Sequence, residues 1–91
     1  MFLKDGDARL DYRVDWHDAC AGGTTIAGSE WSVQPVHAGG IDVSDTAIGD
    51  AVTCAVLAGG RAGCMYVIGN RVTFSDGRID ERSLVVRVEE R

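Results

Sequence analysis

The sequence lacks long hydrophobic runs, has little proline, and carries no excess of positive charge. Its single proline is Pro35, and no apolar stretch is long enough for a signal core or a membrane span. The formal net charge is -5, so a nucleic-acid backbone or an anionic membrane surface would repel the chain at long range. We therefore expect a protein that is made and kept in a cytoplasm and binds neither nucleic acid nor membrane.

Cysteine is also sparse. Cys20, Cys54 and Cys64 cannot all pair with one another, and their spacing contains no Cys-x-x-Cys or Cys/His metal-ligand pattern. Cys54 and Cys64 could lie near each other across a strand pair. In a reducing compartment, however, we expect both to act as small buried hydrophobic side chains.

What the sequence does contain favours strands. Twelve glycines indicate many tight turns, and the apolar residues are rich in valine and isoleucine. At 91 residues the chain has room for one hydrophobic core. We predict a single domain over residues 1–91, in which residues 1–8 form an extended N-terminal arm.

Alternating apolar and polar residues predict the first strands. Residues 10–16 should point one set of side chains to the core: Leu10, Tyr12, Val14 and Trp16. After a turn at residues 21–24, residues 25–33 form a second strand that Gly28 bends, with Ile26, Trp31 and Val33 as its anchors. The segment 34–40 holds Pro35 and two glycines, and we expect it to cross from one sheet to the other.

The rest of the chain predicts further strands over residues 41–48, 52–57, 64–74 and 79–89. Val52, Cys54 and Val56 share one side of their strand. In the next strand the shared side carries Cys64, Tyr66, Ile68, Asn70, Val72 and Phe74. A tight turn at residues 75–78 leads into the last strand, which points Leu84, Val86 and Val88 inward. About seven short strands without a covering helix indicate an all-β, immunoglobulin-like antiparallel β-sandwich.

Tyr66 gives further support to the immunoglobulin-like fold. Its position resembles the approach to the penultimate strand of immunoglobulin-like domains, where a tyrosine bonds to upstream backbone and pins the corner. Tyr66 could equally be a core aromatic residue whose hydroxyl reaches the surface.

Several polar groups contain residue types that also occur in catalytic or metal sites. Asp11, Asp15, His17 and Asp18 are better explained as a solvated strand face and the start of a turn. A second acidic group, Asp42, Asp45 and Asp50, lacks the pattern of a calcium loop. His37 has no partner nucleophile or acid in the sequence, and the glycines of residues 59–63 lack the helix that a phosphate cradle needs. We predict no catalytic residue, no metal and no cofactor.

The best candidate for a specific contact is the charged start of the last strand. Arg78, Asp80, Glu81 and Arg82 lie within five positions, and arginine can make bidentate contacts to the carboxylates of a neighbouring subunit. The alternative is an internally compensated surface, in which the two arginines pair with Asp80 and Glu81.

Nearly the whole chain resembles the small phage proteins known as fibre-tail adaptors. Segments that carry the resemblance, in order, are Lys4-Asp5, Leu10-Asp11-Tyr12, Asp15-Trp16, Gly23-Thr24-Thr25-Ile26-Ala27, Trp31-Ser32-Val33, Leu57-Ala58-Gly59-Gly60, Ala62-Gly63 with Tyr66, Gly77-Arg78, Asp80-Glu81-Arg82-Ser83 and Arg87-Val88. Members of that family commonly carry a second tryptophan after the Asp-Trp pair, where this chain has the shorter segment 18–22. The resemblance implies a virion component that links tail or neck proteins to fibres in repeated copies around a symmetric tail.

These observations favour a non-enzymatic adaptor that acts through symmetric, multi-copy protein contacts in the tail or neck of a virion. A head decoration or head-to-tail completion protein is an alternative within the structural class. A carbohydrate-binding module is an alternative from another class, and it would need Trp16 or Trp31 as an exposed platform for sugar. Their places on apolar strand faces predict core positions instead.

Overall fold

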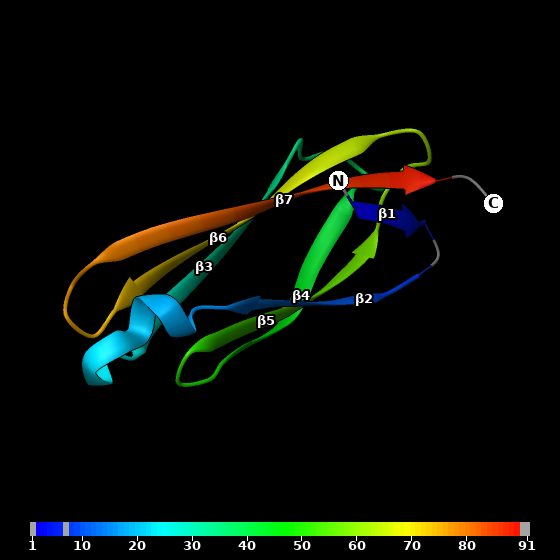
Figure 1. Ribbon diagram of the computed structural model, residues 1–91. Helices are drawn as coiled ribbons and strands as arrows, with labels where there is room; N and C mark the ends of the chain where they lie inside the picture. The colour runs from blue at the N-terminus through cyan, green and yellow to red at the C-terminus, as the bar shows by residue number, and fades with distance from the viewer. Residues whose placement is uncertain (1, 7, 90–91) are drawn as a thin grey trace.

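The computed structural model describes residues 2–6 and 8–89, and for Phe2 it describes the backbone only. Within this part of the chain lie seven strands and one short 3-10 segment (Figure 1): β1 (Phe2–Asp5), β2 (Leu10–Asp15), η1 (His17–Gly23), β3 (Ile26–Gln34), β4 (Ile41–Ile48), β5 (Val52–Gly59), β6 (Met65–Phe74) and β7 (Ile79–Glu89). None of the helical structure described here has the length and apolar character needed to cross a membrane.

Two sheets pack face to face and confirm the predicted immunoglobulin-like β-sandwich. One sheet has the strand order β1-β7-β6-β3 and the other has the order β2-β5-β4. The pair β1–β7 is parallel, and the other strand pairs of the described chain are antiparallel. Strands β3 and β4 belong to different sheets, so the segment 34–40 makes the predicted crossing, and a register shift follows Ile26 beside Gly28.

The core consists of two clusters of buried side chains between the sheets. One contains Ile41, Leu57, Tyr66, Ile68, Val86 and Val88, and the other contains Val14, Trp16, Ile26, Val72 and Phe74. Leu10, Tyr12 and Trp31 pack against these clusters as half-buried residues. The alternation read from β2, β6 and β7 therefore identified the inward faces correctly.

A chain of hydrogen bonds joins the two sheets across this core. The Trp16 indole N–H donates to Thr53 Oγ1 over 3.0 Å, and the Thr53 hydroxyl donates to Asn70 Oδ1 over 2.5 Å. The Asn70 amide nitrogen donates in turn to Ser29 Oγ and to the Glu30 carbonyl. Because Trp16, Thr53 and Asn70 are fully buried, these bonds satisfy polar groups that would otherwise be costly to bury.

Tyr66 forms the predicted corner. Its side chain is fully buried, and its hydroxyl oxygen accepts a hydrogen bond from the backbone N–H of Arg61, five residues upstream, over 3.0 Å. The same hydroxyl lies 3.1 Å from His37 Nε2, and the two rings pack at a centroid distance of 5.5 Å. His37, which lies in the crossing segment 34–40, therefore ties this segment to the corner.

Three details differ from the sequence-based expectations. The turn expected at residues 21–24 overlaps the end of η1, which begins at His17, where the start of a turn was expected, because the Trp16 carbonyl accepts the N–H groups of Ala19 and Cys20. Val52, Cys54 and Val56 do share a side, but the buried side of β5 carries Thr53, Ala55 and Leu57 instead. The segment 1–8, expected as an extended arm, contains β1, which pairs with β7.

The cysteines are free, as expected. Cys54 lies on the outer side of β5, and Cys64 precedes β6 and packs against the core. Since β5 and β6 belong to different sheets, the two thiols do not face each other across one strand pair, which corrects that expectation.

Candidate functional site

Strand β7 has an uncovered edge in its first half. Strand β1 pairs with β7 only from Val86 to Glu89, whereas β6 pairs with it from Ile79 to Arg87. Within residues 2–6 and 8–89, no strand pairs with residues 79–84 on the side away from β6. We call this stretch, Ile79 to Leu84, the open edge; it leads from the β6–β7 hairpin, at the end of the molecule opposite both termini (Figure 1).

The ladder between β6 and β7 fixes which backbone groups the open edge presents. The Phe74 N–H bonds to the Arg78 carbonyl and the Val88 N–H bonds to the Cys64 carbonyl, so positions 78 and 88 both direct backbone groups toward β6. Antiparallel ladders alternate between the two sides of a strand. The odd positions Ile79, Glu81 and Ser83 therefore point their N–H and C=O groups outward along the open edge.

Arg78 holds the hairpin against η1. Its guanidinium bonds to the Asp76 carboxylate (Nε to Oδ2, 2.7 Å) and donates to the Ala19 carbonyl (2.6 Å), while it lies 5.0 Å from the Phe74 ring centroid. Asp76 also accepts the Arg78 backbone N–H. Bonds from this N–H and from the guanidinium hold the pKa of the exposed Asp76 carboxyl below its ordinary value.

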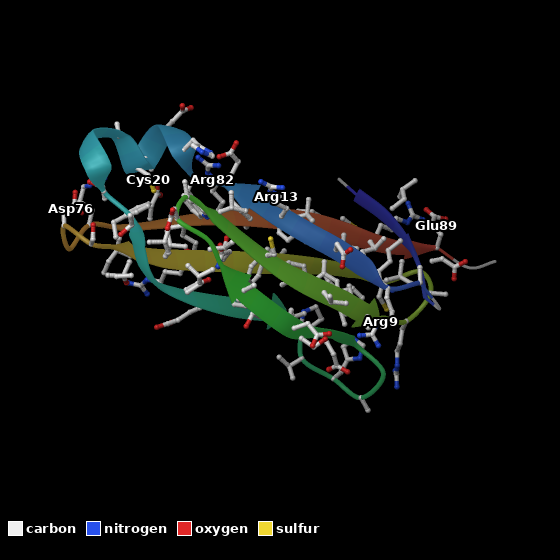
Figure 2. The ribbon with its side chains drawn as sticks, turned by 90° about the horizontal axis from the view of Figure 1, so that it is seen from below. Arg9, Arg13, Cys20, Asp76, Arg82 and Glu89 are labelled. Carbon is white, nitrogen blue, oxygen red and sulfur yellow. The ribbon has the colours of Figure 1, made fainter. Side chains whose placement is uncertain are left out.

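Arg82, on the inner side of the open edge, contacts the end of β2 and the residue that joins it to η1. Its guanidinium donates to the Asp15 carbonyl and lies 4.4 Å from the Trp16 ring centroid. Figure 2 shows Arg82 beside η1, with Asp76 at the hairpin tip and Glu89 at the far end of β7. Burial raises the pKa of the nearby Tyr12 hydroxyl, and the positive charge of Arg82 opposes part of that shift.

Asp80 and Glu81 are exposed, and neither forms an ion pair with Arg78 or Arg82 within the described residues. Instead, Asp80 Oδ1 accepts the backbone N–H of Glu81 over 2.8 Å. The alternative in which Arg78 and Arg82 pair with Asp80 and Glu81 is therefore wrong. The structure brings the four to one hairpin and strand start, where Arg78 bonds to η1 and Arg82 bonds to the end of β2.

A hollow of about 120 Å³ lies where the open edge ends. It is lined by Leu10, Asp11, Tyr12, Leu57 and Leu84. Leu84 is the last residue of the open edge, and Leu10 and Tyr12 come from β2, an outer strand of the other sheet. This hollow offers apolar contacts beside the outward backbone groups.

A second surface that sequence reasoning missed lies on the outer face of the four-stranded sheet, toward the termini. Leu3, Met65 and Val67 are exposed by 57%, 53% and 45%, and the half-buried Val85 pairs with Val67. We call these four residues the outer apolar patch; the exposed Arg87 lies between Leu3 and Met65, since both pair with it. The available signal was the odd positions of the patch residues, which alternate with the buried even positions Lys4, Tyr66, Ile68 and Val86.

The two acidic groups of the sequence lie at the surface. Asp15 Oδ1 accepts the backbone N–H of His17 and lies 2.6 Å from His17 Nδ1. The first of these bonds and then the second lower the pKa of the exposed Asp15 carboxyl. Across the described ranges, no three His, Cys, Asp or Glu side chains gather in a way that could hold a metal ion. Asp45 pairs with Arg9 over 3.5 Å at the surface.

Both tryptophans belong to the core, as expected. Trp16 is fully buried, and Trp31 is half-buried with its ring edge against Tyr12 at a centroid distance of 5.7 Å. Neither ring forms the exposed platform that a carbohydrate-binding module would use. The surfaces that stand out are therefore the open edge and the outer apolar patch, which suit contacts with protein.

Comparison with known proteins agrees with this description. Among curated proteins, none matches the chain. Among protein families, residues 4–87 match the family described as "Podophage GP4 fiber-tail adaptor protein gp77". The match includes the open edge, three of the four residues of the outer apolar patch, and every residue of the two core clusters except Val88. The chain therefore belongs to this family of podophage fibre-tail adaptors.

Proposed function

We propose that this protein is a non-enzymatic component of the virion that joins the phage tail or neck to the tail fibres, with several copies arranged symmetrically around the tail. The family match over residues 4–87 is the observation that carries the proposal. The shape of the molecule supports it, because the principal extents of 45 × 21 × 18 Å separate the two ends. A connector needs two surfaces that two partners can occupy at once.

The two surfaces described above meet this need. The outer apolar patch lies toward the terminal end, and the open edge leads from the hairpin end (Figure 1). Exposed apolar side chains clustered on one face favour burial against another protein. The open edge offers charged and backbone groups, which favour a more selective contact.

Repeated copies would strengthen both contacts. When one copy is bound in a ring, the next contact of a multivalent partner forms at a high effective concentration, so overall attachment can exceed a single affinity by about 100-fold or more. A small domain with modest individual contacts can therefore anchor a fibre.

A reconstruction of the purified virion tests the proposal. We expect density for this domain in several symmetry-related copies between the tail and the fibres, and native mass spectrometry of the detached complex should give the same copy number. Density on the head surface or at the head-to-tail junction would favour decoration or completion instead. A protein that is absent from particles and monomeric would contradict all three roles.

A further inference from the structure

We propose that the open edge of β7 receives an extended segment of a partner protein, which adds a strand to the four-stranded sheet in line with β1. The inference rests on the proposed function, since the partner is taken to be a tail or fibre protein. Strand addition of this kind uses main-chain hydrogen bonds for affinity and side-chain pockets for selectivity.

The backbone provides the first argument. Residues 79–84 are in strand conformation and paired with β6, yet Ile79, Glu81 and Ser83 direct their N–H and C=O groups away from the sheet. Residues 79–83 are all exposed, whereas β7 residues beside β1, such as Val86 and Val88, are fully buried. A strand placed there would complete the ladder that β1 begins.

Asp80 provides the second argument. Its carboxylate oxygen Oδ1 accepts a hydrogen bond from the outward N–H of Glu81 over 2.8 Å. The carbonyl of an added strand would occupy the same position. Local side-chain bonds of this type compete with strand pairing, so Asp80 keeps the edge occupied until a partner displaces it and discourages unselective pairing.

The neighbouring hollow indicates the chemistry of the occupant. Charge gives no preference for an acidic segment, because Arg78 is paired with Asp76 and the exposed Asp80 and Glu81 lie beside Arg82. At the end of the open edge, the hollow lined by Leu10, Asp11, Tyr12, Leu57 and Leu84 suits an apolar side chain. We therefore infer an extended segment with an apolar residue opposite Leu84.

A second copy of this chain fits less well. Two identical antiparallel edges related by a two-fold axis place one residue directly opposite its own copy. Pairing centred on Glu81 sets this charge against its own copy, although it also sets Asp80 opposite Arg82. In the same register Arg78 lies opposite Leu84, so a second copy offers no apolar side chain to the hollow. A different polypeptide avoids this conflict.

The matched substitutions Ser83→Pro and Ser83→Ala test the proposal. Proline at position 83 removes an outward N–H that the β6–β7 ladder does not use, and proline is tolerated on such an edge. Alanine removes the same hydroxyl but keeps the N–H. Circular dichroism and the urea midpoint of each variant establish that both are folded before binding is compared.

Binding is measured with synthetic 12-residue peptides that tile the tail and fibre proteins of the same phage, and with particles assembled from each variant. We expect at least one peptide with an apolar residue at the position opposite Leu84 to bind the wild type and Ser83→Ala alike and to bind Ser83→Pro roughly tenfold more weakly. Hydrogen exchange at Ile79, Glu81 and Ser83 should slow in the complex.

The outcomes separate this inference from the proposed function. If both variants join particles equally and the three amides exchange at the same rate free and assembled, the open edge takes no strand although the adaptor role stands. If the wild type dimerises and Ser83→Pro does not, the occupant is a second copy and the partner named here is wrong. If no form of the protein is found on particles, the adaptor role itself fails.

Discussion

The two halves of β7 differ in what flanks them. From Val86 to Glu89 the strand lies between β1 and β6, and its inward side chains Val86 and Val88 are fully buried. From Ile79 to Leu84 it has, within the described residues, a strand on one side only, and Asp80 and Arg82 take inner-face positions that valine holds in the other half. The comparison teaches that one strand can divide its length between holding the fold and presenting a surface.

We call Val86 to Glu89 the covered half of β7 and Ile79 to Leu84 the open half. The largest effect on stability should come from the covered half. Val86→Ala removes two methyl groups from the first core cluster and should lower the free energy of unfolding by about 2–3 kcal/mol. On the open half, Ser83→Ala should change it by less than about 0.5 kcal/mol. Urea denaturation of the two variants measures both values. Equal losses would mean that the halves do not differ in their contribution to stability.

Tyr66 pairs with Val86 across the covered half and gives the next effect. Tyr66→Phe keeps the buried ring but leaves the Arg61 N–H and His37 without the hydroxyl, so the free energy of unfolding should fall by about 1–2 kcal/mol. His37→Phe, which leaves the bond from Arg61 in place, should cost less. If Tyr66→Phe unfolds at the wild-type urea concentration, the corner does not stabilise the fold.

A smaller loss of stability is expected from an arginine-to-lysine substitution, which can be made in each half of β7. Arg82→Lys keeps the charge but loses the flat contact with Trp16 and the geometry of the bond to Asp15, and should cost about 0.5–1 kcal/mol. Arg87→Lys, on the exposed outer face of the covered half, should cost nearly nothing, since its contact with Glu89 is long at 3.7 Å. Urea midpoints and tryptophan emission compare them, and a larger loss for Arg87→Lys would reverse the comparison.

The covered half could be predicted from the sequence because its pattern has one physical cause. Val86 and Val88 alternate with Val85 and Arg87, and period-two alternation is what a strand with one buried face requires. The same rule gave the inward faces of β2 and β6 and hence the sandwich. It failed on β5, where both sides are apolar enough that Val52, Cys54 and Val56 looked as suitable for the core as Thr53, Ala55 and Leu57.

The open half could be predicted only in part. The charges at residues 78–82 identified a segment that contacts something, but their partners lie far away in the sequence: Ala19 and Phe74 for Arg78, and Asp15 and Trp16 for Arg82. Pairing by proximity suggested Asp80 and Glu81 instead. The open edge itself depends on where β1 ends, and the register of a parallel strand pair leaves no local sequence signal.

The smallest effect is a dependence on pH near the hairpin. Bonds from Arg78 lower the pKa of the Asp76 carboxyl below its ordinary value of 3.8, so the ionised form stabilises the folded state. This contribution is present above the unfolded value and is lost as the pH falls through the lower folded value. Asp76→Asn should therefore remove a small part of the acid sensitivity of the melting temperature below about pH 4. Carboxyl chemical shifts followed by NMR measure the folded pKa of Asp76 directly, and a midpoint at or above 3.8 would contradict the bonding described for the hairpin that leads into the open edge.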